Sequence, residues 1–486
     1  MSTTPQQLLA VSLPRLAVAD RFEILPYDLD VAAGTLEVHY RLLSGDDELA
    51  RFAERVELSE SLVALGEGRQ ADEGAWHGVA RLVALAAGTS YYKVAAPALL
   101  AVTLGPITDA EAEFVRALYD HGLREFAARN DLPVPLVQAW ELEVGDPPHS
   151  QHQDPQPSEP QPSEPRHLDP GTALVPVGGG KDSALVLSVL GEVAVPFTVN
   201  ASVAPRRVAA AAGLPLHTAT RRLDPALRTW NEGGALNGHI PVTAVVTAIS
   251  ALAALAAGCR DVVLGNERSA SEPTRWVGGE PVNHQWAKSL DAEDLTQAAL
   301  AAATGGRLRT FSILRPFTEV AIAGGLVTDP AQLDAFLSCN EAFTMWRETD
   351  QRAEGTWCLN CPKCRFTTLM LAPHLDPERF EATFGGRPLH DPAQADGYRA
   401  LWDEAAKPYE CVGEMVESAA AMAELAQRSE WADAPVVRAT GASAAAYAAE
   451  HGATLATLEK PTDAHRVPAP YLRAMLARLA PGARSA

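Results

Sequence analysis

The sequence predicts an α/β protein whose central part is a parallel sheet with helices on both faces. From residue 171 onward, short apolar runs typical of buried strands alternate with runs suited to helices, the order that produces parallel sheets. A triple glycine at residues 178–180 follows the first of these runs, where ligands bind in such folds. The composition, 47% hydrophobic and 21% charged residues, is that of an ordinary globular chain.

Residues 1–145 predict a separate N-terminal α+β domain. Residues 36–42 alternate apolar and polar side chains, as a half-buried strand does. Residues 110–132 fit an amphipathic helix. Its apolar positions are Phe114, Leu118, Leu123 and Phe126.

A proline-rich segment, residues 146–170, is predicted to be an extended linker or insert. Eight prolines lie between Pro147 and Pro170, and Gln-Pro-Ser-Glu-Pro occurs twice in tandem. Because proline fixes φ and removes a backbone donor, this segment is unsuited to the interior of a helix or sheet. It precedes the central domain at 171–375, and residues 376–486 are expected to form a mainly helical C-terminal region.

The central domain is expected to alternate strands and helices. The expected strands are 173–177, 193–199, 214–218 and 261–266, and the expected helices are 182–190, 206–212 and 242–259.

The charge excludes some partners. The formal net charge is -21, from 61 acidic and 40 basic side chains. This field repels nucleic-acid backbones and the chain has no dense basic run, so a small-molecule substrate is expected instead. The first residues lack a basic segment followed by an apolar core, and threonine, serine and alanine dilute the longest apolar stretch, residues 242–259. We therefore expect a cytoplasmic protein with no membrane partner.

The glycine loop predicts an anion site. Glycines bring backbone N–H groups close to an oxyanion, and the following helix adds unpaired donors. The Walker pattern does not fit, because an aspartate follows the lysine, and the dinucleotide pattern does not fit, because serine occupies its third glycine position. A bare turn between a strand and a helix is the simpler alternative. The loop consists of Gly178, Gly179, Gly180, Lys181, Asp182 and Ser183.

Four of the six cysteines cluster and predict a metal site. Cys358, Cys361 and Cys364 follow one another at two-residue gaps, with Cys339 upstream. Four thiolates suit a closed, structural zinc site, because a complete thiolate shell leaves no position for water. An iron–sulfur cluster or unliganded thiols are the alternatives.

The loop resembles the Ser-Gly-Gly-x-Asp-Ser motif of the PP-loop ATP pyrophosphatases, with Gly178 in place of the first serine. This resemblance implies a sheet of the adenine nucleotide alpha hydrolase-like type and cleavage of ATP between its α and β phosphates. The loop together with Gly265 and Asn266 would bind ATP, and Asp182 would orient the loop or help place Mg²⁺.

A larger resemblance, to the bacterial UDP-N-acetylmuramoyl-L-alanyl-L-glutamate epimerases, covers most of the chain in scattered segments. It implies ATP-dependent inversion of the terminal L-glutamate of a UDP-muramoyl dipeptide, through an acyl-adenylate. The segments are residues 88–93, 178–183, 236–243, 265–267, 282–285, 358–366 and 407–414.

Three residues are candidates for proton transfer in that reaction. Cys411 has two acidic sequence neighbours, Glu410 and Glu414, which would raise its pKa, so a buried structural cysteine is an alternative. His239 and His284 are the other candidates, each with a binding or structural role as its alternative.

Seven further residues are expected to contact the substrate. For Tyr92 the alternative is a strand that packs one of two neighbouring tyrosines inward and the other outward. For Lys407 and Glu410, the alternative is a solvated loop. The seven are Tyr92, Lys93, Asn283, Gln285, Lys288, Lys407 and Glu410.

Other functions remain open at this level. The loop followed by the cysteines also resembles 7-cyano-7-deazaguanine synthase, a shorter enzyme that activates a carboxylate with ATP. A PP-loop ligase or thiolase acting on a nucleoside or tRNA is another alternative, which the acidic charge disfavours. A non-catalytic zinc scaffold with a vestigial loop is the third.

Overall fold

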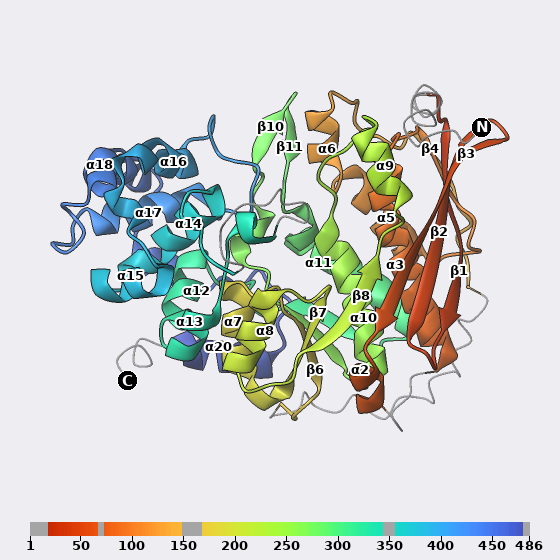
Figure 1. Cartoon of the computed structure of the whole chain (residues 1–486), viewed down its shortest axis with the longest axis horizontal. Helices are drawn as coiled ribbons and strands as arrows, with labels where there is room; N and C mark the ends of the chain where they lie inside the picture. Colours follow the sequence, from red (N-terminus) through yellow and green to blue (C-terminus); the bar gives the residue numbers. More distant parts are fainter. Residues whose placement is uncertain (1–17, 67–71, 148–167, 344–354, 480–486) are drawn as a thin grey trace, which may run out of the picture.

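The computed structural model describes residues 18–66, 72–147, 168–343 and 355–479, and within them ten strands form one mixed sheet (Figure 1). The strand order across the sheet is β12-β9-β6-β7-β8-β3-β2-β1-β4-β5. In chain order the strands are β1 (Arg21–Asp30), β2 (Thr35–Ser44), β3 (Asp47–Leu58), β4 (Leu99–Val102), β5 (Ala139–Glu141), β6 (Ala173–Pro176), β7 (Ala194–Val199), β8 (His217–Arg222), β9 (Asp261–Leu264) and β12 (Arg309–Ser312). A separate hairpin pairs β10 (Arg275–Val277) with β11 (Glu280–Val282).

The five strands β12, β9, β6, β7 and β8 are parallel, as predicted for the central part of the chain. From β6 the chain passes to β7 and then to β8. It returns through helix α10 (Val242–Ala257) to β9, on the other side of β6. This reversal makes the carboxyl ends of β6 and β9 a topological switch point, where open α/β sheets bind ligands.

The N-terminal strands extend the same sheet. Strand β3 pairs antiparallel with β8, with Leu58 opposite Ala219, so the N-terminal strands β1 to β5 and the central strands share one sheet. Strands β1 to β3 form an antiparallel meander, and β4 and β5 run parallel to β1. The alternation predicted for 36–42 is confirmed, since alternate side chains of β2 are buried. Residues 148–167, most of the predicted linker, lie outside the described residues.

Helices pack into two hydrophobic cores, one on each face of the sheet. One face carries α2 (Glu60–Leu65), α3 (Glu73–Ala87), α5 (Asp109–Asp120), α10 and α11 (Leu290–Thr304). Helices α3 and α11 approach so closely that a Cβ at Gly78 would lie 2.0 Å from the carbonyl oxygen of Ala303. The other face carries α7 (Lys181–Leu190), α8 (Val203–Ala211), α12 (Glu319–Leu326), α13 (Pro330–Ala335) and α20 (Ala469–Leu479).

The elements described between residues 376 and 479 are all helical, and α15 to α18 lie at the end of the molecule opposite the N-terminal strands (Figure 1). The last helix, α20, returns to the sheet, where the Tyr471 hydroxyl donates to Asp261 of β9 at 2.8 Å. No helix in the described part is long and apolar enough to span a bilayer. Helix α14 (Pro362–Leu371) precedes this region, and the other α-helices within it are α15 (Pro377–Phe384), α16 (Ala395–Arg399), α17 (Met415–Leu425), α18 (Pro435–Glu450) and α19 (Leu455–Leu458).

Two local interpretations differ from the structure. The helix expected at 110–132 is two helices, α5 and α6 (Arg124–Arg129), separated by a turn. The strand considered for Tyr91 and Tyr92 is instead the short helix α4 (Thr89–Tyr92), which buries both rings completely. The Tyr92 ring meets that of Tyr119 edge-on at 5.2 Å. Tertiary aromatic packing therefore overrides the β propensity of tyrosine here.

Candidate active site

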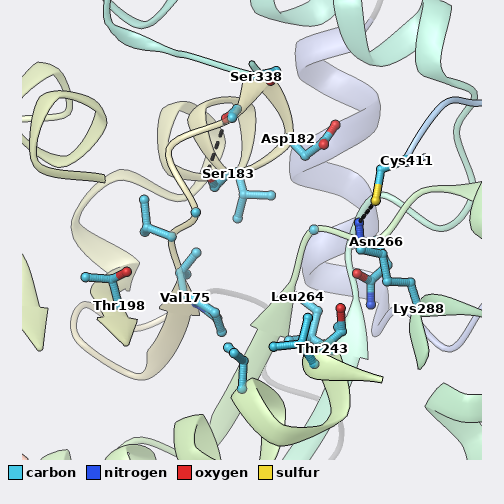
Figure 2. Close-up of a pocket in the computed structure, with 18 of the residues that line it drawn as sticks. Val175, Asp182, Ser183, Thr198, Thr243, Leu264, Asn266, Lys288, Ser338 and Cys411 are labelled. Carbon is cyan, nitrogen blue, oxygen red and sulfur yellow. Dashed lines mark hydrogen bonds between the residues drawn. The ribbon is translucent and has the colours of Figure 1, made fainter. Parts of the chain in front are cut away.

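A cavity of about 410 Å³ opens at the carboxyl ends of β6, β7 and β9, at the switch point (Figure 2). The glycine loop, residues 178–183, forms part of its wall, and Gly265 and Asn266 follow β9 into it. Lys288, Lys363 and Cys411 line another part of the same cavity. The remaining wall is largely apolar, which suits a small ligand oriented by a few polar groups. These apolar residues include Val175, Val199, Val242, Val246 and Leu264.

Close packing dictates the glycines of the loop. Gly179 has a φ of +85°, and a Cβ there would lie 2.5 Å from the carbonyl carbon of Ala204 at the start of α8. Gly180 is the N-cap of α7. The Ser183 hydroxyl accepts the Gly179 N–H at 3.2 Å and donates to the Gly180 carbonyl at 3.1 Å. The loop is thus held open toward the cavity with the N-terminus of α7 behind it.

Lys181 does not line the cavity. Its ammonium group is completely buried and pairs with the carboxylates of Asp182 and Glu319. Burial lowers the pKa of Lys181, but the charges of Asp182 and Glu319 outweigh that effect and raise it. The carboxylate of Asp182 lies at the cavity wall, so Lys181 acts from behind it as a buried counter-charge.

The thiol of Cys411 lies in a cationic environment. The ammonium of Lys288 is 3.6 Å from the sulfur (Figure 2), and that of Lys363 donates to the backbone carbonyl of Cys411. Burial alone would raise the pKa of Cys411, but the Lys288 charge and the interaction with His284 lower it to about 6. The thiol is therefore a thiolate at neutral pH.

The expected effect of acidic neighbours on Cys411 is thus wrong. The carboxylate of Glu414 is held by the guanidinium of Arg268, with contacts of 2.9 and 2.6 Å, and Glu410 accepts from Asn340. Proximity in sequence does not place these carboxylates against the sulfur. Lysines from two distant segments determine its charge instead.

A carboxylate that sequence reasoning did not identify completes the site. Glu125, buried in α6, contacts Nδ1 of His284 at 2.5 Å and Nε of Arg129 at 2.7 Å. Burial disfavours the charged ring of His284, but its interactions with Cys411 and Glu125 raise the pKa of His284 to about 9. Glu125, His284 and Cys411 therefore form a linked carboxylate, imidazolium and thiolate. No motif surrounds Glu125 in the sequence, so only the fold reveals it.

The ring of His239 packs on that of His284, with centroids 4.3 Å apart. Burial and the positive charge of His284 lower the pKa of His239 to about 4, so its ring is neutral at pH 7. The two rings, both candidates for proton transfer, therefore differ in charge. Lys93 supports the segment before His239, because its ammonium donates to Asn237 at 2.5 Å.

The polar segment 283–288 positions the Lys288 ammonium. The Asn283 side chain accepts the Gln285 N–H at 2.7 Å and donates to the Ala270 carbonyl at 2.9 Å. The Gln285 side chain is buried and accepts from Lys288 at 3.3 Å. All three were predicted to contact the substrate. Lys288 lines the cavity, whereas Asn283 and Gln285 stabilise the segment that carries Lys288.

Two other residues predicted to contact the substrate bond to protein groups outside the cavity. Tyr92 has no exposed surface, and its hydroxyl donates to the Pro97 carbonyl at 3.0 Å. Lys407 is buried, and its ammonium pairs with Glu272 at 2.8 Å. Both hold segments that surround the site and do not reach the cavity.

The four clustered cysteines converge beside the cavity. Their sulfurs lie within 4.8 Å of one another. Cys361 is the N-cap of α14, where its sulfur accepts the Cys364 N–H at 3.3 Å, and the Cys358 sulfur accepts the Cys361 N–H at 3.2 Å. Such N–H···S bonds and a helix N-terminus stabilise thiolates. The donor set therefore suits a tetrahedral cation such as zinc.

Comparisons with known proteins identify the family of the chain. The model of the MurL N-terminal domain matches residues 15–313, and the model of the MurL C-terminal domain matches residues 335–455. The chain belongs to the MurL family. No solved structure matches it significantly.

Three curated relatives in this family share the printed name UDP-N-acetyl-alpha-D-muramoyl-L-alanyl-L-glutamate epimerase. The protein of Micromonospora sp. is 39% identical over 460 residues, covering 94% of this chain and 98% of the relative. That of Salinispora tropica is 39% identical, covering 86% and 88%. That of Xanthomonas oryzae pv. oryzae is 39% identical, covering 74% and 76%.

The cavity combines the two MurL domains. The glycine loop, Asn266 and Lys288 fall in the region matched by the N-terminal model, whereas Lys363 and Cys411 fall in the C-terminal one. All four clustered cysteines also belong to the C-terminal region. Neither domain alone has both the loop and the thiol.

Proposed function

We propose that this protein is an ATP-dependent epimerase of peptidoglycan precursor synthesis, which inverts the terminal L-glutamate of UDP-MurNAc-L-Ala-L-Glu. The relatives' shared name supports the reaction and the substrate. The observation that carries the mechanism is that one cavity is lined by both the glycine loop and the Cys411 thiol. A bound nucleotide and the terminal glutamate, whose Cα–H is the acid in this reaction, can therefore occupy the same cavity. A sheet of the PP-loop type, with the loop at the switch point, fits this proposal.

ATP has a chemical purpose in this reaction. The Cα–H of a glutamate with a free carboxylate is a poor acid, since the carboxylate resists further negative charge. Attack of a carboxylate oxygen on the α-phosphorus of ATP breaks the bond to the β-phosphate and releases pyrophosphate. The resulting acyl-adenylate is a much better electron sink, so the proton at Cα becomes removable.

The charges around the cavity suggest the roles of its residues. The Cys411 thiolate removes the Cα proton, and the electron pair moves to the acyl oxygen, where the ammonium groups of Lys288 and Lys363 stabilise the enolate. The imidazolium of His284, held at Nδ1 by Glu125, contacts the Cys411 sulfur and keeps it a thiolate, and solvent water returns a proton to the opposite face of Cα. Water then attacks the acyl carbon and releases AMP. The Cys411 thiol then gives its proton to the hydroxide left by the water that protonated Cα, which restores the thiolate.

The loop would hold the nucleotide. The backbone N–H groups of Gly178 and Gly180 and the N-terminus of α7 would face a polyphosphate, and the apolar wall suits adenine and ribose. The Asp182 carboxylate has the hard oxygen ligands that Mg²⁺ prefers, and Mg²⁺ would neutralise phosphate charge during transfer.

Incubation with ATP, Mg²⁺ and the UDP-muramoyl dipeptide tests the proposal. We expect AMP, pyrophosphate and D-glutamate, the last by chiral analysis after hydrolysis of the peptide. An ATP analogue with a methylene bridge between the α and β phosphates should support no epimerisation, because the bond that must break is replaced. Formation of ADP would contradict the loop assignment. AMP formation without D-glutamate would contradict the epimerase.

We further propose that the four clustered cysteines hold one structural zinc ion. Metal analysis of the purified protein is expected to give about one zinc per chain. Cys361→Ser should lower that content strongly, whereas Cys259→Ser, a buried cysteine outside the cluster, should not. Iron and acid-labile sulfide in place of zinc would indicate a cluster instead, and a metal content near zero would exclude both.

A further inference from the structure

The loop lacks a hydroxyl where its motif has one. Gly178 occupies the position of the first serine, and it lines the cavity. The remaining loop serine, Ser183, bonds to the loop backbone through Gly179 and Gly180. A phosphate bound at the loop would therefore meet backbone N–H groups but no hydroxyl from residue 178.

A serine from a distant segment lies against this loop. The hydroxyl oxygen of Ser338 accepts the backbone N–H of Lys181, the first residue of α7, at 3.2 Å. Its side chain lines the same cavity as Gly178 and is labelled beside the loop in Figure 2. A Cβ at Gly180 would lie 2.9 Å from this oxygen, so the glycine gives the hydroxyl its space.

Two contacts fasten the Ser338 segment to the loop. Besides the Ser338 bond, the backbone N–H of Leu337 donates to the Gly179 carbonyl at 2.8 Å. Cys339, the next residue, is completely buried within the cysteine cluster. Ser338 is therefore fixed on both sides, and only 7% of its surface is exposed.

The chemistry of Ser338 suits a phosphate oxygen. A serine hydroxyl has one proton to donate and two lone pairs to accept with. Because Ser338 accepts from Lys181, its own proton remains available for an acceptor in the cavity. An anionic oxygen is the strongest acceptor that could lie there.

We propose that Ser338 supplies the phosphate-binding hydroxyl that the loop lacks at residue 178. The hydroxyl comes from the C-terminal MurL domain and donates to a phosphate oxygen of ATP bound at the loop. This inference rests on the proposed use of ATP. It also explains how glycine is tolerated at 178, because the hydroxyl reaches the loop from another segment.

A serine side chain can be placed at residue 178 without a steric clash. A Cβ at Gly178 would have no heavy atom within 4 Å, and the backbone there lies outside the left-handed region. Gly178→Ser can therefore restore the hydroxyl in the loop without a clash. This makes a double-mutant cycle possible between two positions that are far apart in sequence.

The test is the affinity of the full chain for Mg²⁺–ATP, measured by calorimetry in four forms. Ser338→Ala is expected to weaken binding about 10-fold, the effect of losing one hydrogen bond to a charged group. In the Gly178→Ser background, the same substitution is expected to cost less than about 3-fold, because a second hydroxyl is present. The matched control is Ser188→Ala. Ser188 lies on α7, the helix that begins at Lys181, but its hydroxyl bonds to Asp329 outside the cavity, so this variant should bind Mg²⁺–ATP as tightly as wild type does.

Each outcome decides a different question. If wild type does not bind Mg²⁺–ATP, the proposed function fails. If wild type binds and Ser338→Ala binds equally well, the inference on Ser338 fails while the function stands. A loss of the same size in both backgrounds also overturns it, because a purely structural role for Ser338 would not depend on residue 178.

Discussion

Cys411→Ser is expected to lower the rate of epimerisation by about 10²- to 10⁴-fold, while substrate-dependent cleavage of ATP to AMP continues. A serine hydroxyl has nearly the same shape, but it remains protonated at neutral pH and cannot act as a carbon base. The thiolate, in contrast, is stabilised by Lys288 and His284, which lower the pKa of Cys411 to about 6. Adenylation needs only the loop and the substrate carboxylate, so it should survive.

The measurement is incorporation of solvent deuterium at Cα of the terminal glutamate, with AMP followed in the same reaction. In the wild type, the rate should fall as the pH drops below about 6, because protonation removes the thiolate. His284, whose imidazolium contacts the sulfur, keeps its charge across this transition because its pKa is raised to about 9. Cys259→Ser controls for loss of a buried thiol elsewhere. Deuterium entry at the wild-type rate in Cys411→Ser would remove the thiol from proton transfer.

The parts of the site that the sequence predicts are those formed by residues close together in the chain. Strand β6, the glycine loop and helix α7 are contiguous, so their periodicity and glycines indicate the anion site directly. Cys358, Cys361 and Cys364 lie around the N-terminus of one helix, so their spacing alone brings the sulfurs together.

The remaining parts depend on contacts between distant segments. Glu125 meets His284 across 159 residues, and Ser338 meets Lys181 across 157. Local periodicity contains no information on such pairs. For the same reason, the acidic neighbours of Cys411 in sequence gave a pKa shift of the wrong sign, whereas Lys288 and Lys363 determine it in space.

The fold shows the same division. Alternation of strands and helices predicts the parallel half of the sheet. The pairing of β3 with β8 joins two segments on either side of the proline-rich residues, and it depends on which edge of the sheet remained free. Which strand pairs with the free edge of β8 depends on how the helices pack on both faces of the sheet. The pattern of apolar residues within one strand contains no information on that packing.

Lys181→Met is expected to reduce the free energy of unfolding by about 3–5 kcal/mol, because it leaves the buried Glu319 carboxylate without its counter-charge. Lys181 has no exposed surface, and its ammonium pairs with both Glu319 and Asp182. Urea denaturation followed by tryptophan fluorescence gives the change from the shift in the transition midpoint. Glu319, also buried, is its matched partner, and Glu319→Gln alone should likewise destabilise the fold.

The double variant separates a structural role of Lys181 from a role in phosphate binding. With Lys181→Met and Glu319→Gln together, one buried charge of each sign is removed, so much of the lost stability should return. ATP affinity should return with it, because Asp182 and the backbone of the loop would regain their positions. A double variant as stable as wild type that still binds ATP at least 10-fold more weakly would show that the Lys181 charge acts on the nucleotide itself.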